Sequence, residues 1–590
     1  MPNKEQLKAI QSKAGPLLVL AGPGSGKTYV ITHHMIYLIS ECRIPANQIL
    51  VITFTKAAAL EMQKRAVSAN PACSYVIFGT FHSVFYHILK LSNPNKAYQL
   101  AGDKERFLLL KDLIKNENSH DTSVDLVQEA ECCMQEISRF KNLFPDSLSQ
   151  QNEKMPEKYR RINRLYEEWL RENGKLDFDD MIKLCYQQLK SDRKLRSYWQ
   201  DRFSHILIDE FQDINRLQYE TICLLGANHN IYAVGDDDQA IYSFRGSDPA
   251  LMNQFIRDFD AKTVSLVDNY RSSRDIVALS SRFIAHNKDR FEKHPQAVSD
   301  RTDSLKVIPC QSAKEELMTI QEAVFQYHDQ YPDKTQAILL RTNRQVYAYQ
   351  NIGQGQREDT ILALDLLSYL AFFNEGYKRS DFIKIMNKPV RYIPYGILSE
   401  PVIDFAKLKK RAMGKSWVVE RLVELERQVA FAKGLDMAGQ ARYIYKAMGY
   451  EAYYKSGVKT HPEIGTDQIT DQTQDQAFEL FLGRLKNCND LSTLQKEYEA
   501  EQKTDQKNSH VTVMTYHASK GLEFDRVYLP NLEYGKVPHG RMLTLQELEE
   551  ERRMFYVALT RAKESLWLLH DKSQTVSPFL EELKNTEKKR

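Results

Sequence analysis

The sequence predicts an α/β protein built from two doubly wound cores, each interrupted by a mainly helical insertion. Three observations favour this fold class. Short apolar runs recur along the 590 residues, helical periodicity lies between most of them, and two long helical stretches lack such runs. At about 150 residues per domain, this length also favours roughly four domains.

The first core is expected from six short apolar runs, which are typical of buried parallel strands. They lie at 16–21, 49–54, 75–79, 205–208, 231–235 and 263–266. Between about 86 and 200 the pattern changes to long helical periodicity rich in Lys, Glu and Leu. We therefore assign residues 1–85 and 201–275 to the first core, and residues 86–200 to its helical insertion.

The second core is expected from five further runs of the same kind. They lie at 304–308, 336–340, 511–515, 526–529 and 565–569. Residues 276–375 and 506–590 are assigned to this core, and residues 376–505 to a second, compact helical insertion. The four domains then form two interrupted cores instead of a linear array.

The composition excludes several classes of protein. Lys and Arg total 81 against 78 Asp and Glu, so the net charge is +3 and the chain is not a histone-like polycation. Any contact with nucleic acid must therefore come from a local groove. No apolar run approaches the ~20 residues of a membrane span. Eight scattered cysteines without a C-x-x-C pair favour reduced thiols and a cytoplasmic location, with no zinc or iron–sulfur site.

A glycine-rich loop follows the first strand and precedes a helical pattern. The residues expected to contact a nucleotide are Gly22, Gly24, Ser25, Gly26, Lys27 and Thr28. Glycines let successive backbone N–H groups surround phosphates at a helix N-terminus. Lys27 is expected to reach the β- and γ-phosphates, and the Thr28 hydroxyl to ligate Mg²⁺. The strict pattern begins with Gly where this chain has Ala21, but the flanking strand and helix favour a phosphate site over an empty turn.

An acidic pair ends the strand predicted at 205–208. Asp209 is expected to hold Mg²⁺ through water, and Glu210 to polarise an attacking water. An Asp-Glu pair alone is more often a solvated surface, but the phosphate loop reverses that preference. The two elements together predict an enzyme that hydrolyses a nucleoside triphosphate.

Several longer strings occur in a fixed order along the chain. They are DEFQD (209–213), VGDDDQAIYSFRG (234–246), NYRS (269–272), TYHASKGLEF (515–524) and FYVALTRA (555–562). In this order they resemble the motif set of superfamily 1 DNA helicases of the UvrD/Rep/PcrA group, from residue 3 to about residue 563. The resemblance implies an ATP-dependent DNA helicase with two RecA-like P-loop domains, each carrying a helical insertion, that uses ATP and Mg²⁺.

The resemblance also implies roles around the nucleotide. Gln6 matches the residue that contacts adenine, Tyr270 the one that stacks on the base, and Glu523 the contact to the ribose. The residues matching those around the γ-phosphate are Gln239, Arg245, Arg271 and Arg561. Because Lys27 lies in the first core and Arg561 in the second, ATP is expected in the cleft between them.

Single-stranded nucleic acid is commonly bound by aromatic platforms beside a basic groove. The residues matching DNA contacts of the family are Phe54, Thr55, His82, Tyr242, Phe244, Thr515, His517 and His539. Phe244 replaces the usual Trp and offers less π-surface for stacking.

Three departures from the family pattern affect these expectations. Tyr29 occupies a position usually held by Arg beside adenine, where its ring could stack instead. The first DNA loop lacks the Asn usually found before Lys56, and an extended stretch usually present after 341–343 is missing.

Three functions are weighed. The leading hypothesis is a helicase that moves 3′→5′ on single-stranded DNA and acts in repair or replication restart. Its expected partners are single-stranded DNA, duplex junctions and repair or replication proteins; it is expected to be monomeric and to bind no membrane. The second is a translocase that strips proteins from DNA or drives a nuclease or defence complex. The third, an inactive DNA-binding scaffold, requires the loss of Lys27, Glu210 or an arginine finger, and all are present.

Overall fold

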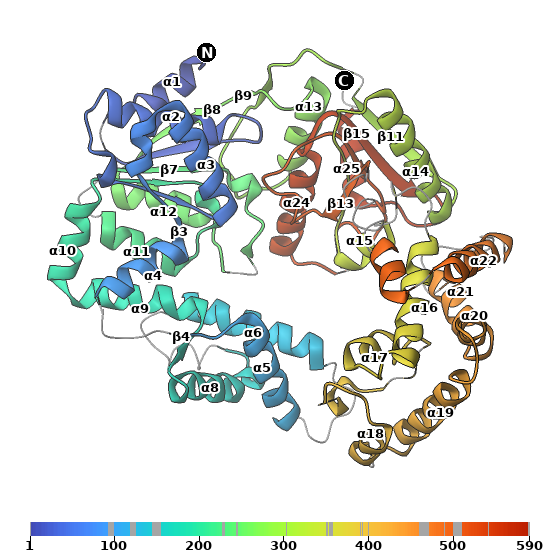
Figure 1. The fold of residues 1–590 in the computed structure, drawn as a ribbon. Coiled ribbons are helices and arrows are strands. Elements are labelled where there is room, and N and C mark those ends of the chain that lie inside the picture. Colours follow the sequence, from blue (N-terminus) through green and yellow to red (C-terminus); the bar gives the residue numbers. More distant parts are fainter. Residues whose placement is uncertain are drawn as a thin grey trace.

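The computed structural model describes most of the chain. The described residues are 2–13, 15–92, 99–117, 126–143, 155–226, 230–243, 246–302, 304–349, 352, 358–389, 391, 393–398, 400–412, 414–459, 471–488, 490–498, 510–540 and 542–587. Two α/β cores lie side by side, and the helices of the two insertions extend below them in the view of Figure 1.

The first core is a parallel sheet of six strands. The strands are β1 (Leu17–Ala21), β2 (Ile49–Thr53), β3 (Ile77–Thr80), β6 (His205–Ile208), β7 (Asn230–Gly235) and β8 (Lys262–Leu266). Their order is β3-β2-β6-β7-β1-β8, and every neighbouring pair is parallel. Both faces are covered, since alternate residues of each inner strand belong to two different buried clusters.

Helices cover both faces of this sheet. One face carries α1 (Lys4–Ile10), α2 (Lys27–Ser40) and α3 (Lys56–Ala69). The other carries α4 (Phe81–Ser92), α9 (Phe178–Ser191), α10 (Arg193–Arg202), α11 (Arg216–Gly226) and α12 (Ala250–Phe259). Short 3-10 helices are η1 (Ala46–Gln48), η2 (Pro71–Tyr75), η3 (Phe211–Asp213) and η4 (Asp237–Gln239). Two helices assigned from the sequence to the insertion, α9 and α10, thus pack against a face of the first sheet.

The remainder of the first insertion has its own small core. It contains α5 (Asp103–Glu117), α6 (Leu126–Leu143) and α8 (Glu157–Glu172). Two short strands, β4 (Gln99–Leu100) and β5 (Lys175–Leu176), pair in parallel where the chain enters and leaves this unit.

The second core is a parallel sheet of five strands in the order β11-β15-β14-β12-β13. The strands are β11 (Leu305–Cys310), β12 (Gln336–Leu340), β13 (Thr512–Thr515), β14 (Phe524–Leu529) and β15 (Ala562–Asp571). One face packs on α13 (Arg274–Ile284), α24 (Leu545–Leu559) and α25 (Pro578–Glu587), and the other on α14 (Ala313–Gln330) and α15 (Asn343–Tyr349). A separate parallel pair joins β9 (Asp268–Asn269), on the connection between the cores, to β10 (Gln296–Ala297), which lies between α13 and β11.

The second insertion is a helical unit around one large buried cluster. Its elements are α16 (Glu358–Asn374), α17 (Arg379–Ile385), η6 (Tyr395–Ile397), α18 (Phe405–Arg411), α19 (Ser416–Ala432), α20 (Met437–Arg442), the π-helix η7 (Tyr443–Ala447), α21 (Tyr450–Lys459) and α22 (Asp471–Asn487). The cluster begins at Leu362 in α16 and continues to Tyr498. The domain limits assigned from the sequence stay a prediction, while this packing groups α16 with the insertion.

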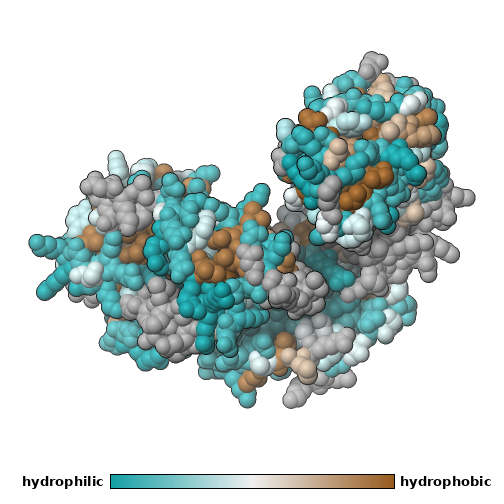
Figure 2. Space-filling model, turned by 90° about the horizontal axis from the view of Figure 1, so that it is seen from below, coloured by the Kyte–Doolittle hydropathy of each residue, from teal (hydrophilic) through white to brown (hydrophobic). Residues whose placement is uncertain are grey.

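The predicted fold class is confirmed, and each of the eleven predicted strands coincides with a strand of one of the two sheets. Figure 2 shows the molecule from below as two lobes with an open notch between them, mainly hydrophilic with scattered apolar patches. Among the described residues, no helix has both the length and the apolar character needed to cross a bilayer.

Candidate functional site

The glycine loop connects β1 to α2. Gly24 and Gly26 have φ angles of +70° and +88°, which favour glycine. A Cβ atom on Gly24 would lie 2.6 Å from the Cβ of Arg271. The loop therefore needs glycine both for its backbone conformation and for the close approach of the 269–271 segment.

The side chains of Ser25 and Lys27 hold the loop in place, and no side chain caps the start of α2. The Ser25 hydroxyl donates to the Gly22 carbonyl at 2.8 Å, and Lys27 Nζ donates to the Ala21 carbonyl at 3.1 Å. Thr28 lies in the first turn of the helix, which has no side-chain cap. Free N–H groups at this helix end can bind an anion such as a phosphate.

The acidic pair follows β6, and the two carboxyl groups differ in their surroundings. Burial and the neighbouring Glu210 raise the pKa of Asp209. Burial opposes ionisation of Glu210 too, but Lys27 and Lys520 outweigh it and lower its pKa. Glu210 also has a left-handed backbone (φ +52°), and it accepts a hydrogen bond from the Gln212 amide. Of the two carboxyl groups, Glu210 is thus the one whose anionic form Lys27 and Lys520 favour.

Gln239 and Arg561 meet between the two cores. Gln239 Nε2 donates to Asp236 at 2.6 Å, while its Oε1 accepts from Arg561 Nη2 at 3.3 Å. Arg561 is 1% exposed, and its Nε donates to the Val557 carbonyl at 2.8 Å. Burial and the neighbouring Arg271 lower the pKa of Arg561 to about 9, so the guanidinium stays charged at neutral pH.

Two further ion pairs surround this contact. Arg271, next to the glycine loop, donates from Nε to Glu523 of the second core at 2.7 Å. Lys520 donates from Nζ to Asp213 at 2.5 Å and to the Gln239 carbonyl at 2.7 Å. Lys520 lies inside a matched string but has no individual role assigned from the sequence, because its two contacts depend on how the cores meet.

Gln6 lies in the first turn of α1 and is buried against the glycine loop. Its Nε2 donates to the Ser25 carbonyl at 3.0 Å. The Tyr270 amide donates to the Gly24 carbonyl at 2.9 Å, and its ring is 48% exposed. Tyr29 is also exposed, with its ring 3.8 Å from that of His33. Gln6, Tyr270 and Tyr29 thus surround one side of the loop.

A second group of predicted residues gathers around Tyr242, where the two cores meet. The rings of Phe54 and Tyr242 stack with centroids 4.8 Å apart, and the His517 ring lies 6.5 Å from Tyr242. The Lys520 ammonium lies 5.0 Å from the centre of the Tyr242 ring. Aromatic groups from both cores therefore meet beside the lysine that contacts Asp213.

The remaining predicted residues are more dispersed. The Thr55 side chain caps α3 by accepting from the Ala58 amide, and Thr515 accepts likewise from the Ala518 amide. The rings of His82 and Phe178, the first residue of α9, form an edge-to-face contact with centroids 5.9 Å apart.

The His539 backbone amide donates to Glu551 at 2.9 Å. Two predicted residues, Phe244 and Arg245, lie outside the described residues.

Comparisons with known proteins agree with this arrangement. Residues 2–260 match the UvrD/REP helicase N-terminal domain, and residues 264–400 and 454–573 match the UvrD-like helicase C-terminal domain.

The chain is also similar to whole proteins. It is 31% identical over 612 residues to YjcD of Bacillus subtilis, a protein assigned as an ATP-dependent DNA helicase, covering 96% of this chain and 78% of the relative. It is 31% identical over 634 residues to DNA helicase II of Rickettsia typhi (97% and 92%), and 29% identical over 619 residues to the ATP-dependent DNA helicase Rep of Escherichia coli (96% and 90%). The chain belongs to the UvrD/Rep/PcrA group of DNA helicases.

Proposed function

We propose that this protein uses ATP hydrolysis to move 3′→5′ along single-stranded DNA and to unwind duplexes in DNA repair or replication restart. The contacts of Arg561 with Gln239 and of Lys520 with Asp213 carry this proposal, because they join the second core to the glycine-loop core at one site. The direction of travel and the cellular role rest on the family alone.

ATP binding is assigned to the loop and its surroundings. The phosphates take the free N–H groups of the loop and of the first turn of α2, and the Lys27 ammonium leaves the Ala21 carbonyl for them. The base lies against Gln6 and Tyr270. Glu523 exchanges its pairing with Arg271 for the ribose, which frees that guanidinium for the γ-phosphate.

Magnesium fits this donor set. The Thr28 hydroxyl and the Asp209 carboxylate are hard oxygen donors of the kind that Mg²⁺ prefers. When bound, Mg²⁺ neutralises charge on the β- and γ-phosphates.

Hydrolysis is assigned to groups from both cores. Glu210 takes a proton from the attacking water. The oxygen of that water bonds to the γ-phosphorus while the bond from the γ-phosphorus to the β–γ bridging oxygen breaks. Arg561 and Arg271 stabilise the charge on the transferring group. Gln239 accepts a hydrogen bond from Arg561, and we assign it to sense the γ-phosphate. Arg245 has the same assignment from the family.

DNA binding is assigned to the group around Tyr242, where aromatic side chains of both cores meet. Bases stack on Phe54 and Tyr242, Phe244 has the same assignment from the family, and Thr515 and His517 hold the strand from the second core. Thr55, His82 and His539 extend the track. Lys520 contacts both the Asp213 carboxylate and the Tyr242 ring. Closure of the two cores on ATP would therefore change how tightly this site binds DNA.

Strand displacement tests direction and unwinding. We expect ATP-dependent separation of a duplex with a 3′ single-stranded tail, and little separation with a 5′ tail or blunt ends. Lys27→Ala serves as the hydrolysis control and should abolish separation. Equal activity on both tails would contradict the proposed direction.

A second function is a translocase that strips proteins from DNA or serves as the motor of a nuclease or defence complex. The compact second insertion, which is one helical unit around a single cluster, favours it. The same purified chain would then hydrolyse ATP on single-stranded DNA and displace a protein block, such as streptavidin on a biotinylated end, without separating strands. Robust unwinding by the monomer would exclude this alternative.

The eight cysteines are all free thiols, which supports a reducing compartment, and we place the protein in the cytoplasm. We expect it to act as a monomer at single-strand–duplex junctions together with repair or replication proteins.

A further inference from the structure

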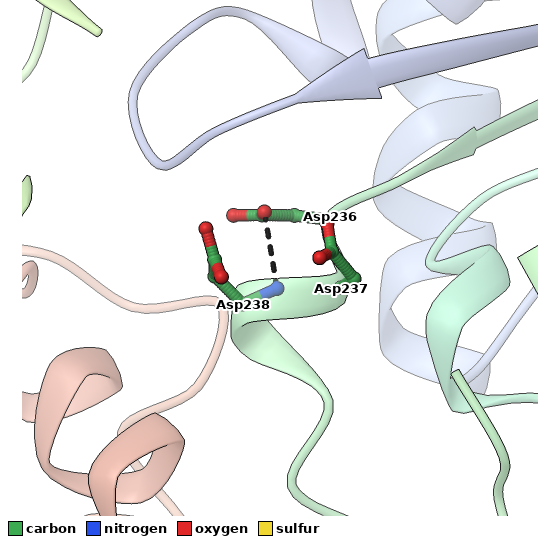
Figure 3. A group of neighbouring side chains, drawn as sticks. All are labelled: Asp236, Asp237 and Asp238. Carbon is green, nitrogen blue, oxygen red and sulfur yellow. Dashed lines mark hydrogen bonds between the residues drawn. The ribbon is translucent and has the colours of Figure 1, made fainter. Parts of the chain in front are cut away.

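Three consecutive aspartates follow β7 and lead into η4, directly before Gln239. Asp236, Asp237 and Asp238 are buried, and Figure 3 shows their carboxylates turned toward one another. Their oxygens lie within 4.8 Å of one another, a spacing that could hold a metal ion. Three buried carboxylates this close need a cation to balance their charge.

The chain supplies two cations to this cluster itself. Lys293 Nζ lies 2.5 Å from Asp236, 2.5 Å from Asp237 and 2.8 Å from Asp238. Arg290 donates from Nε and Nη2 to the two oxygens of Asp238, at 2.9 and 2.7 Å. Because an ammonium already lies among the three carboxylates, we assign them to an ion-pair cluster and not to a metal.

Both cations come from the segment of the second core that lies between α13 and β11. Its first residues are bound to α24, since the Lys288 amide donates to Glu549 at 3.0 Å and Arg552 donates to Asn287 at 2.8 Å. Farther along, this segment forms β10, which pairs with β9.

The β9 residue Asn269 in turn donates to the Pro23 carbonyl of the glycine loop at 2.8 Å. One short segment therefore contacts α24 and the aspartate cluster directly, and reaches the glycine loop through β9.

These contacts close a ring around the site. Arg561 follows α24, whose earlier turns hold the 287–288 end of the segment. Lys293 and Arg290 hold the aspartates, and Asp236 accepts from Gln239 Nε2 at 2.6 Å. Gln239 completes the ring at Arg561. The relative position of these two residues is thus set by the cluster as well as by their own 3.3 Å contact.

We propose that Lys293 and Arg290 are positioning residues for ATP hydrolysis: they hold the Asp236–Asp238 turn so that Gln239 faces Arg561 and the γ-phosphate. This inference rests on the proposed ATP-driven cycle. The hydrogen bonds and ion pairs of the Lys293 and Arg290 side chains go to the three aspartates, and not to the glycine loop, Gln6 or Tyr270. Loss of either cation should therefore affect turnover more than ATP binding.

The test is steady-state ATP turnover by the full chain on single-stranded DNA, with kcat and KM determined separately. In Lys293→Met we expect kcat to fall by about 10–100-fold, the scale of a small misplacement of a catalytic group, with KM for ATP within about twofold of wild type. Lys293→Arg keeps the charge and should recover most of the turnover. Lys288→Met, an exposed position on the same segment, is the matched control and should behave as wild type.

A second variant keeps the test decisive if Lys293→Met does not fold. Arg290→Lys keeps the charge but loses the paired hydrogen bonds to Asp238, and should lower kcat while leaving KM and the circular dichroism spectrum unchanged. A purely structural role would instead lower the unfolding temperature and leave kcat per folded molecule intact, which would overturn the inference. If wild type shows no DNA-stimulated turnover, the proposed function fails; if wild type is active and the folded variants match Lys288→Met, only this inference fails.

Discussion

Glu316 shows how a single buried side chain can make stability depend on pH. It lies in α14 at 1% exposure, where it accepts from the Tyr349 hydroxyl at 2.7 Å and from the Asn531 amide at 3.2 Å. Burial and the nearby Glu533 raise the pKa of Glu316 to about 7, although Lys536 opposes them. The folded protein therefore binds this proton more tightly than the unfolded chain does.

This shift predicts that Glu316→Gln stabilises the protein more at high pH than at low pH. The wild-type carboxyl loses stability as pH rises from its ordinary pKa to about 7, because deprotonation leaves a buried charge. At about 1.36 kcal/mol per pKa unit, the full effect is about 3 kcal/mol above pH 7. Unfolding curves at pH 5 and pH 8 measure it. Glu322→Gln, exposed on the same helix, is the control, and an equal gain for Glu316→Gln at both pH values would contradict the account.

At the scale of single residues, the sequence predicts those residues whose role depends on adjacent positions in the sequence. Gly24, Lys27 and Asp209 stand in contiguous strings, so their expected roles follow from the local pattern. Lys293 and Lys520 could not be assigned in this way. Their partners, Asp236 and Asp213, are 57 and 307 residues away in sequence, so their contacts exist only once the two cores are placed.

At the scale of elements, buried strands are predicted well because parallel strands covered on both faces are apolar throughout. Amphipathic helices are harder, since periodicity reveals an apolar face but not what covers it. For this reason the sequence pattern assigns α9 and α10 to the insertion, whereas in the structure they pack on the first sheet.

The insertion and the first core are joined by a buried polar network at α6 and α9. Lys141 Nζ lies 2.9 Å from Asp177, 2.8 Å from Asp180 and 2.7 Å from Glu167. Beside it, the Asn142 side chain accepts from Asn215, which follows η3 in the first core, at 3.0 Å.

Removing this lysine should destabilise the insertion strongly. Lys141→Met removes the ammonium shared by three carboxylates and leaves Asp177 with Arg106 alone. Loss of one partner from a buried ion pair costs about 3–5 kcal/mol. Denaturant unfolding and limited proteolysis of the 99–176 region measure the effect. Lys115→Met, exposed in the last turn of α5, should have almost none. If the two variants unfold alike, the network does not stabilise the insertion.

The stacked pair of Phe54 and Tyr242 gives a prediction about DNA. Tyr242→Ala should weaken binding of single-stranded DNA by about 1–3 kcal/mol, the usual value of one stacked base, while leaving KM for ATP unchanged. Fluorescence anisotropy with a labelled oligonucleotide measures this, and Tyr198→Ala, an exposed tyrosine on α10, is the control. Unchanged affinity would remove this pair from the DNA track.

At the scale of the whole molecule, the two cores meet at one candidate site to which both contribute side chains. Lys27 and Glu210 come from the first core, Arg561 and Lys520 from the second, and the contacts at Gln239 and Asp213 join them. The sequence predicts this division because the motifs lie on both sides of the insertions. It does not predict which residues hold the cores in register.

ATP turnover on single-stranded DNA by Lys27→Ala and Arg561→Ala, each alone and then mixed, tests this shared site most directly. Each variant should lose DNA-stimulated turnover, Arg561→Ala by about 10³–10⁵-fold as expected for an arginine finger. Mixing should restore nothing, because both groups must act within one chain. Near-wild-type turnover by Arg561→Ala, or recovery on mixing, would contradict a site formed between the two cores of a single molecule.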